Sequence, residues 1–131
     1  MDPLGKGIKK VAVVLFNLGG PDKRESIRPF LYNFFTDKNI VPLPWPLRQF
    51  VAGRIAARRS RREAGDSYAE LGYRSPLLEN SEAQARALHE VLKRNGRLRA
   101  QVFVSMRYWH PRSDEVIEKV RDFAPDHVVF L

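Results

Sequence analysis

The 131-residue chain contains no cysteine. Within these residues that absence excludes a disulfide framework, a thiolate nucleophile and the cysteine-rich zinc or iron–sulfur sites. It is compatible with a reducing compartment, and the cytoplasm is the expected location. The sequence also has no apolar run of about 18 residues and no cleavable leader, so we expect a protein that neither spans a membrane nor is secreted.

Acidic side chains are the minority, because 15 Asp and Glu stand against 23 Lys and Arg, a net charge of +8. Such a surface attracts phosphates, anionic lipid or an acidic ligand without selecting among them. Five arginines concentrate the excess within nine positions: Arg54, Arg58, Arg59, Arg61 and Arg62. These arginines leave open a basic module that binds polyanions or lipid, and equally a solvated helix face. With 44% apolar residues the chain can build the core of a globular domain.

A short, continuous apolar run rich in β-branched residues at 11–16 predicts a strand that is covered on both faces of a parallel sheet. The runs at 101–106 and 127–131 predict a second and a third strand. Helical spacing of apolar residues predicts helices over 27–35, from Leu47, from Ser81 and over 116–123. Ser81 and Gln84 form a capping box, and Pro111 suits the start of the last helix. The alternation predicts an α/β fold with a parallel sheet and helices on both faces.

In open parallel sheets ligands bind beyond the carboxyl ends of the strands, where the sequence offers residues 17–21 and 107–111. The first segment holds Gly19, Gly20 and Pro21, whose spacing does not match a dinucleotide fingerprint, so we expect no nucleotide. The second segment holds a guanidinium, a phenol, an indole and an imidazole in four consecutive positions, Arg107 to His110. These residue types indicate a cleft for a flat, anionic, partly apolar ligand.

Four landmarks stand in one order along the chain: VLFNLGGP at 14–21, the Arg58–Arg59 pair, Tyr68 followed by Ser75–Pro76, and MRYWHP at 106–111. In this order and spacing, from about Val11 to Leu131, the sequence resembles the N-terminal part of ferrochelatases. The resemblance implies two similar Rossmann-like α/β domains, which hold a porphyrin in the cleft between them and no nucleotide. We therefore expect residues 1–131 to form an incomplete first domain, with the second domain absent from the chain.

The activity that the resemblance implies is insertion of Fe²⁺, as a substrate, into protoporphyrin IX to give protohaem in haem biosynthesis. The main catalytic His and Glu of the family lie further along its chain, so we expect these 131 residues to be inactive alone. Coproporphyrin III is the alternative substrate within the family, and an iron–sulfur cluster beyond these residues is left open. We expect the remainder of the same polypeptide as a partner, and no nucleic acid.

The resemblance also implies roles for individual residues. Leu18 faces the porphyrin or the path of the metal, and its side chain is no metal ligand. Arg107 and Tyr108 are the inner-cleft pair that shapes the metal side of the pocket. The expected porphyrin contacts in the middle of the chain are Arg58, Arg59, Tyr68 and Ser75.

Residues 42–62 resemble the lip of the cleft, and the apolar face of residues 45–59 is expected to meet the membrane that supplies the porphyrin. The protein would then lie peripherally on the inner membrane. In the loop before Ser75, Tyr73 and Arg74 follow Gly72 where the family usually has three glycines. The whole interpretation requires the turns near Gly19 and Tyr108 to line one crevice side by side.

Overall fold

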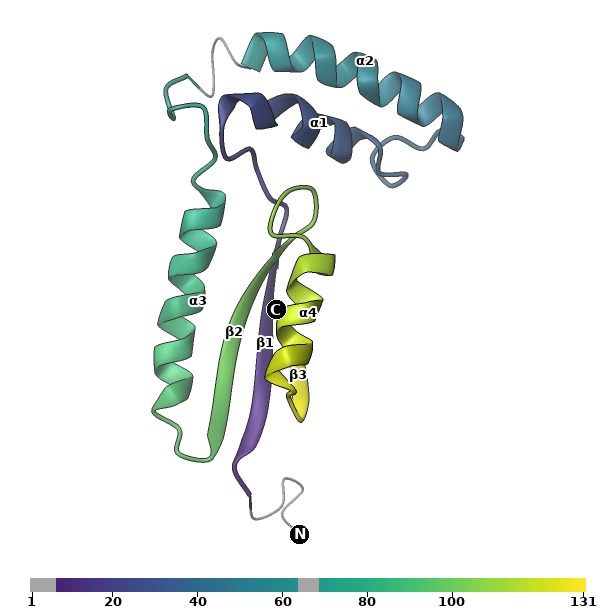
Figure 1. Cartoon of the computed structure of the whole chain (residues 1–131). Coiled ribbons are helices and arrows are strands. Elements are labelled where there is room, and N and C mark those ends of the chain that lie inside the picture. The colour runs from purple at the N-terminus through teal and green to yellow at the C-terminus, as the bar shows by residue number, and fades with distance from the viewer. Residues whose placement is uncertain (1–6, 64–68) are drawn as a thin grey trace. The chain divides into compact units, whose positions relative to one another are not determined.

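A computed structural model describes residues 7–63 and 69–131 of the chain. Its elements are, in order, β1 (Lys9–Asn17), the 3-10 helix η1 (Arg24–Ser26), α1 (Ile27–Phe35), α2 (Trp45–Glu63), α3 (Leu77–Lys93), β2 (Leu98–Met106), α4 (Ser113–Phe123) and β3 (His127–Phe130) (Figure 1). The described residues form two compact units. Residues 7–18 and 79–131 are the sheet unit, and residues 19–63 and 69–78 are the hairpin unit.

The sheet unit contains three parallel strands in the order β2-β1-β3. Strand β1 lies in the centre and pairs with β2 along its whole length, from Lys9 opposite Leu98 to Asn17 opposite Met106. Strand β3 pairs with residues 11–14 of β1. The predicted α/β fold with a parallel sheet is therefore confirmed, and all three strands run toward the same edge.

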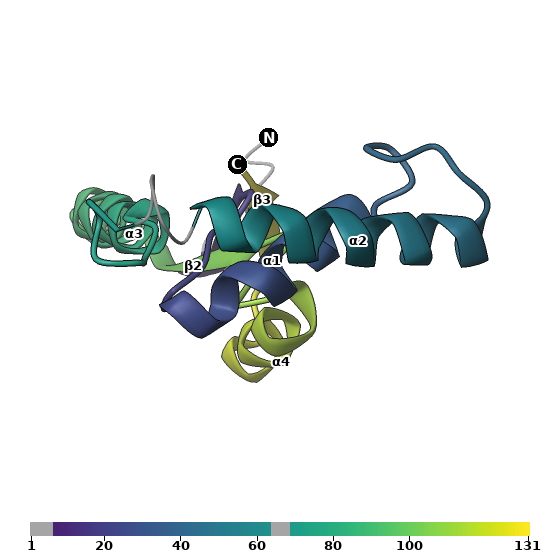
Figure 2. The same cartoon turned by 90° about the horizontal axis from the view of Figure 1, so that it is seen from above.

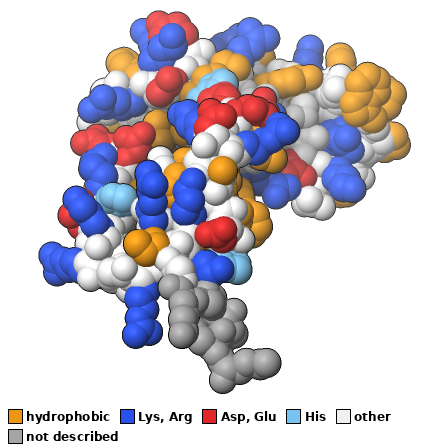
Figure 3. Space-filling view, turned by 60° about the horizontal axis from the view of Figure 1, so that its bottom comes forward, with side chains coloured by type: hydrophobic (Ala, Val, Ile, Leu, Met, Phe, Trp, Pro, Cys, Tyr) orange, Lys and Arg blue, Asp and Glu red, His pale blue; other side chains and the backbone are white. Residues whose placement is uncertain are grey.

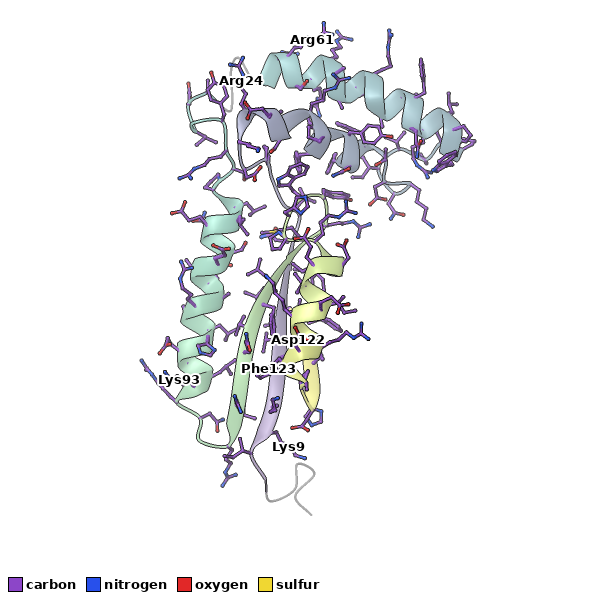
Figure 4. The ribbon with its side chains drawn as sticks, viewed as in Figure 1. Lys9, Arg24, Arg61, Lys93, Asp122 and Phe123 are labelled. Carbon is purple, nitrogen blue, oxygen red and sulfur yellow. The ribbon has the colours of Figure 1, made fainter. Side chains whose placement is uncertain are left out.

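Helix α4 covers one face of this sheet, as the view along the strands shows (Figure 2). Its Val116 packs into a buried cluster with Ala12 and Val14 of β1 and Phe103 of β2. Phe123, near the end of α4, also packs against this cluster (Figure 4). A groove of about 1150 Å³ runs along β2 and is lined by residues 98–104 of the strand, by α3 and by the α4 residues Val116, Lys119 and Phe123.

Two predicted helix starts are wrong. Ser81 is no N-cap, because α3 begins at Leu77 and Ser81 is buried within the helix at 3% exposure. Ser75 takes the capping role: its Oγ accepts the Leu77 N–H at 3.2 Å, and Pro76 lies between them, directly before the helix. Pro111 lies outside α4, which begins at Ser113, and its carbonyl accepts the Met106 N–H at 2.7 Å.

The hairpin unit is built on the packing of α1 against α2. Helix α1 buries Ile27, Phe30 and Leu31, whereas α2 buries only small side chains, Ala52 and Ala56. Leu47 and Phe50, which belong to the predicted apolar face of α2, are 49% and 66% exposed. At about 100° per residue both lie on the side of the helix away from Ala52 and Ala56.

Candidate functional site

The backbone pairing of β1 and β2 continues beyond the carboxyl ends of the two strands. The Arg107 N–H donates to the Asn17 carbonyl at 3.0 Å, and the Tyr108 N–H donates to the Leu18 carbonyl at 3.0 Å. Two segments that are far apart in sequence thus lie side by side at one edge of the sheet unit. This arrangement confirms the expected convergence for residues 17–18 and 107–108.

The side chains at this edge differ in exposure. Leu18 is 46% exposed and presents an apolar surface, whereas Tyr108 is buried at 7%. The guanidinium of the exposed Arg107 lies over the Tyr108 ring, 5.4 Å from its centroid. Because stacking on a fixed ring orients a guanidinium, Arg107 and Leu18 offer a positioned cation next to an apolar contact. A ligand that combines an anionic group with an apolar plane suits this edge.

His110 has a partner that the sequence analysis did not predict. Its Nδ1 contacts Oε1 of Glu115, a residue in the first turn of α4. The Trp109 ring meets the His110 ring edge-on, with centroids 5.1 Å apart. The two residues are five positions apart across a loop, a separation that does not indicate a pair. The contact links the segment after β2 to the covering helix.

Asn17 and Ser81 form a second connection that the sequence analysis missed. The Asn17 side chain is engaged at both ends: Oδ1 accepts the Leu18 N–H at 2.8 Å, and Nδ2 donates to Ser81 Oγ at 3.3 Å. Ser81 lies on α3, so the carboxamide joins the end of β1 to that helix. Ser81 was predicted to cap a helix, so its hydrogen bond to Asn17 was not expected.

In the hairpin unit the predicted arginine pair divides between two surfaces of α2. The Arg59 guanidinium lies over the Phe35 ring of α1, 5.5 Å from the centroid. Arg58 is exposed on another side, since neighbouring residues of an α-helix point about 100° apart. Tyr68, the other aromatic residue predicted here, lies outside the described residues.

Ser75 is tied to the segment that follows β1. Its N–H donates to the Pro21 carbonyl at 2.7 Å. Gly20 leaves the room for this approach, because a Cβ added there would lie 2.4 Å from Ser75 Cβ. Ser75 thus has a structural role as a tether and helix cap, and its contact with a porphyrin stays a prediction.

The loop before Ser75 keeps a glycine-like backbone despite its side chains. Gly72 has φ 69° and Tyr73 has φ 61°, the left-handed region that bulky residues rarely adopt. The Arg24 guanidinium lies over the Tyr73 ring at 5.1 Å, and this contact favours the conformation.

Comparison with known proteins decides the family. The sequence model of the family described as "Ferrochelatase" matches residues 10–131. The chain belongs to the ferrochelatase family. It is 49% identical over 122 residues to the ferrochelatase of Wolbachia sp. subsp. Drosophila simulans (strain wRi), an alignment that covers 93% of this chain and 38% of that protein. It is also 49% identical over 123 residues to the ferrochelatase of Phenylobacterium zucineum (strain HLK1), covering 93% of this chain and 36% of that protein.

The chain thus spans just over a third of the length of its ferrochelatase relatives. Family membership and the Rossmann-like α/β class agree with the sequence analysis. The division of the family fold into two domains and the role of each site residue stay predictions.

Among residues 7–63 and 69–131, no group of three or more His, Cys, Asp or Glu side chains could hold a metal ion. No helix within the same ranges has the length and apolar character needed to cross a membrane.

The surface of α2 combines apolar and basic side chains. Near its N-terminus Trp45, Leu47 and Phe50 are 63%, 49% and 66% exposed. Orange side chains gather at the end of the hairpin unit where α2 begins, with blue side chains beside them (Figure 3). Further along, Arg61 projects from the outer side of the helix (Figure 4).

Proposed function

We propose that this chain takes part in the insertion of Fe²⁺ into protoporphyrin IX, which releases two pyrrole protons and gives protohaem. Membership of the ferrochelatase family supports the reaction class. The observation that carries the proposal is the edge of the sheet unit at which Leu18, Arg107 and Tyr108 meet through the Leu18–Tyr108 backbone hydrogen bond.

The chemistry assigns these residues binding and shaping roles. A planar macrocycle hides its nitrogen lone pairs, so insertion requires that the protein hold the ring distorted while a base accepts protons. Leu18 contacts the apolar face of the ring, and Arg107 stacked on Tyr108 forms the wall on the metal side. In this proposal the main catalytic His and Glu belong to a later segment of the ferrochelatase sequence, which residues 1–131 do not match. The chain alone therefore carries out no insertion.

The hairpin unit supplies further porphyrin contacts in this proposal, through Arg58, Arg59, Tyr68 and Ser75. A guanidinium is suited to a propionate, because it can donate two parallel hydrogen bonds to one carboxylate. The stacking of Arg59 on Phe35 supports this role, since it restrains the long side chain before a ligand arrives.

The lip, residues 42–62, rests on a membrane surface in this proposal. The exposed Trp45, Leu47 and Phe50 can enter the interface while the neighbouring arginines meet anionic headgroups. The protein is then cytoplasmic and bound peripherally to the inner membrane. An apolar and basic lip favours protoporphyrin, which dissolves in the membrane, over the more highly charged coproporphyrin.

A hybrid enzyme tests the reaction. Residues 10–131 replace the matching segment in the ferrochelatase of Phenylobacterium zucineum, and ferrous iron insertion into protoporphyrin is followed by absorbance. We expect an active hybrid, and roughly 10- to 100-fold lower kcat/KM for Arg107→Leu, the effect of losing a hydrogen bond to a charged group.

A folded hybrid that binds protoporphyrin without inserting iron would contradict the proposal. Equal losses of thermal stability and of activity in Arg107→Leu would show that this arginine is structural. A hybrid that fails to fold redirects the test to protoporphyrin binding by the 131-residue chain, where absence of binding contradicts the proposal.

A further inference from the structure

We propose that Asn17 is a positioning residue for the ligand-facing edge of the sheet unit and that it acts through Ser81. The proposal rests on the proposed function, since it names the residues that hold Leu18 and Tyr108 in place. Neither residue belongs to the set that the family resemblance assigned. All the contacts involved lie within the sheet unit.

Asn17 sits at a point where the ladder of the sheet ends and the turn begins. It is the last residue of β1, and its backbone carbonyl accepts the Arg107 N–H at 3.0 Å. Its side-chain Oδ1 accepts the next N–H, that of Leu18, at 2.8 Å. The Leu18 N–H and the Asn17 carbonyl belong to one peptide unit, so the orientation of the Asn17 carboxamide fixes the peptide that accepts the Arg107 N–H. The next carbonyl along the chain, that of Leu18, accepts the Tyr108 N–H.

A carboxamide at a strand end can rotate unless its other end is held. Ser81 supplies that restraint, because its Oγ accepts Asn17 Nδ2 at 3.3 Å. The hydroxyl belongs to a side chain that is 3% exposed and carried by a regular helix, so it cannot follow a moving partner. A buried hydroxyl is costly without a hydrogen bond, which favours retention of this pair.

One series of hydrogen bonds therefore runs from Ser81 on α3 through the Asn17 side chain at the end of β1 to Leu18, which is bonded to Tyr108. It couples a helix to the two residues proposed to face the porphyrin. A shift of α3 against β1 would act first on the Asn17–Leu18 peptide, whose carbonyl accepts the Arg107 N–H. The other buried serines of the described residues are bonded elsewhere: Ser26 donates to Asp22, and Ser105 pairs with Ser113 at 3.3 Å. Ser105 thus offers a matched control, since it is equally buried, in the same unit and bonded at the same distance.

The first measurement is amide hydrogen exchange by NMR on the 131-residue chain, which needs no ligand. In Ser81→Ala we expect the Leu18 and Tyr108 amides to exchange at least about fivefold faster, the effect of losing one neutral hydrogen bond. The Leu131 amide, which donates to the Val14 carbonyl, should be unchanged. Unchanged exchange at Leu18 and Tyr108 would overturn the proposal.

The second measurement is the Kd for protoporphyrin IX, obtained by fluorescence titration and set against the urea stability of each variant. We expect Ser81→Ala to weaken binding about fivefold, and Ser105→Ala to lower stability similarly while Kd stays within about twofold. In an Asn17→Ala background, Ser81→Ala should cause no further loss of affinity, because both changes break one connection.

Additive losses, or equal weakening by Ser105→Ala, would mean that both serines act through general stability and would overturn the positioning role. If the unmodified chain binds no protoporphyrin, the proposed function is contradicted. The exchange data would still decide whether Asn17 and Ser81 hold the turn.

Discussion

Gly20 lies where two segments of the hairpin unit come closest, and its replacement by alanine should be costly. The added Cβ would lie 2.4 Å from Ser75 Cβ and 2.6 Å from Ser75 Oγ. Ordinary contacts between carbon atoms need about 3.5 Å, so one segment must move by about 1 Å. Ser75 cannot yield freely, because its N–H is bonded to Pro21 at 2.7 Å and its Oγ caps α3.

The expected loss is about 2 kcal/mol in the free energy of unfolding, the middle of the range for overpacking a fixed site. Urea unfolding measures it through Trp45 fluorescence in a Trp109→Phe background, which leaves the reporter in the hairpin unit. Gly96→Ala is the matched control, because no atom lies within 4 Å of its added Cβ. We expect that control to change stability by less than about 0.5 kcal/mol.

A second substitution tests the cause of the loss. Ser75→Gly removes the atoms that the new methyl group meets. As a change of helix cap it should lower the free energy of unfolding by only about a few tenths of a kcal/mol. The double variant Gly20→Ala/Ser75→Gly should therefore be about as stable as Ser75→Gly alone. Equal stability of Gly20→Ala and Gly96→Ala, or no recovery in the double variant, would refute the reasoning.

Three further outcomes are expected. Val116→Ala should lower the free energy of unfolding by about 2 kcal/mol in a urea titration, since it removes two buried methyl groups from the sheet-unit core. Its neighbour Ile117 is 55% exposed and serves as the control. Ile117→Ala should cost under about 1 kcal/mol in the same titration. Replacing Trp45 and Phe50 by serine should weaken cosedimentation with anionic vesicles roughly tenfold or more, given about 1.5–3 kcal/mol for each large side chain buried, and unchanged binding would contradict the lip. Tyr73→Gly relieves the left-handed backbone but removes the ring under Arg24, so limited proteolysis should cut this loop faster; slower cutting would show that backbone strain outweighs the stacking.

Much of the fold could be predicted from the sequence because local patterns determine it. The run at 11–16 carries the β-branched composition of a doubly covered strand, the run at 101–106 predicts a second strand, and both fall within observed strands. The start of α3 was mispredicted, because the sequence offers two start signals: a capping box at Ser81 and a Ser–Pro pair at residues 75–76. Pattern alone does not decide between them. The side of α2 that packs against α1 was not predicted, because it carries alanines, which give little hydrophobic signal.

The candidate site divides in the same way. The pairing of Leu18 with Tyr108 was predictable, because the carboxyl ends of neighbouring parallel strands must meet at one edge. The bond between Asn17 and Ser81 joins residues 64 positions apart and depends on the rotation of α3, which no local pattern encodes. For the same reason the sequence did not show that Arg59 stacks on Phe35 while Arg58 does not.

The most direct test of the central claim is a titration of the 131-residue chain with protoporphyrin IX at low and high salt, beside a DNA titration under both conditions. We predict that porphyrin binding survives high salt, because it buries an apolar macrocycle, while any DNA binding falls steeply. We also predict that Arg107→Leu weakens porphyrin binding. Porphyrin binding that disappears with salt in parallel with DNA binding would contradict the account and favour a general polyanion surface.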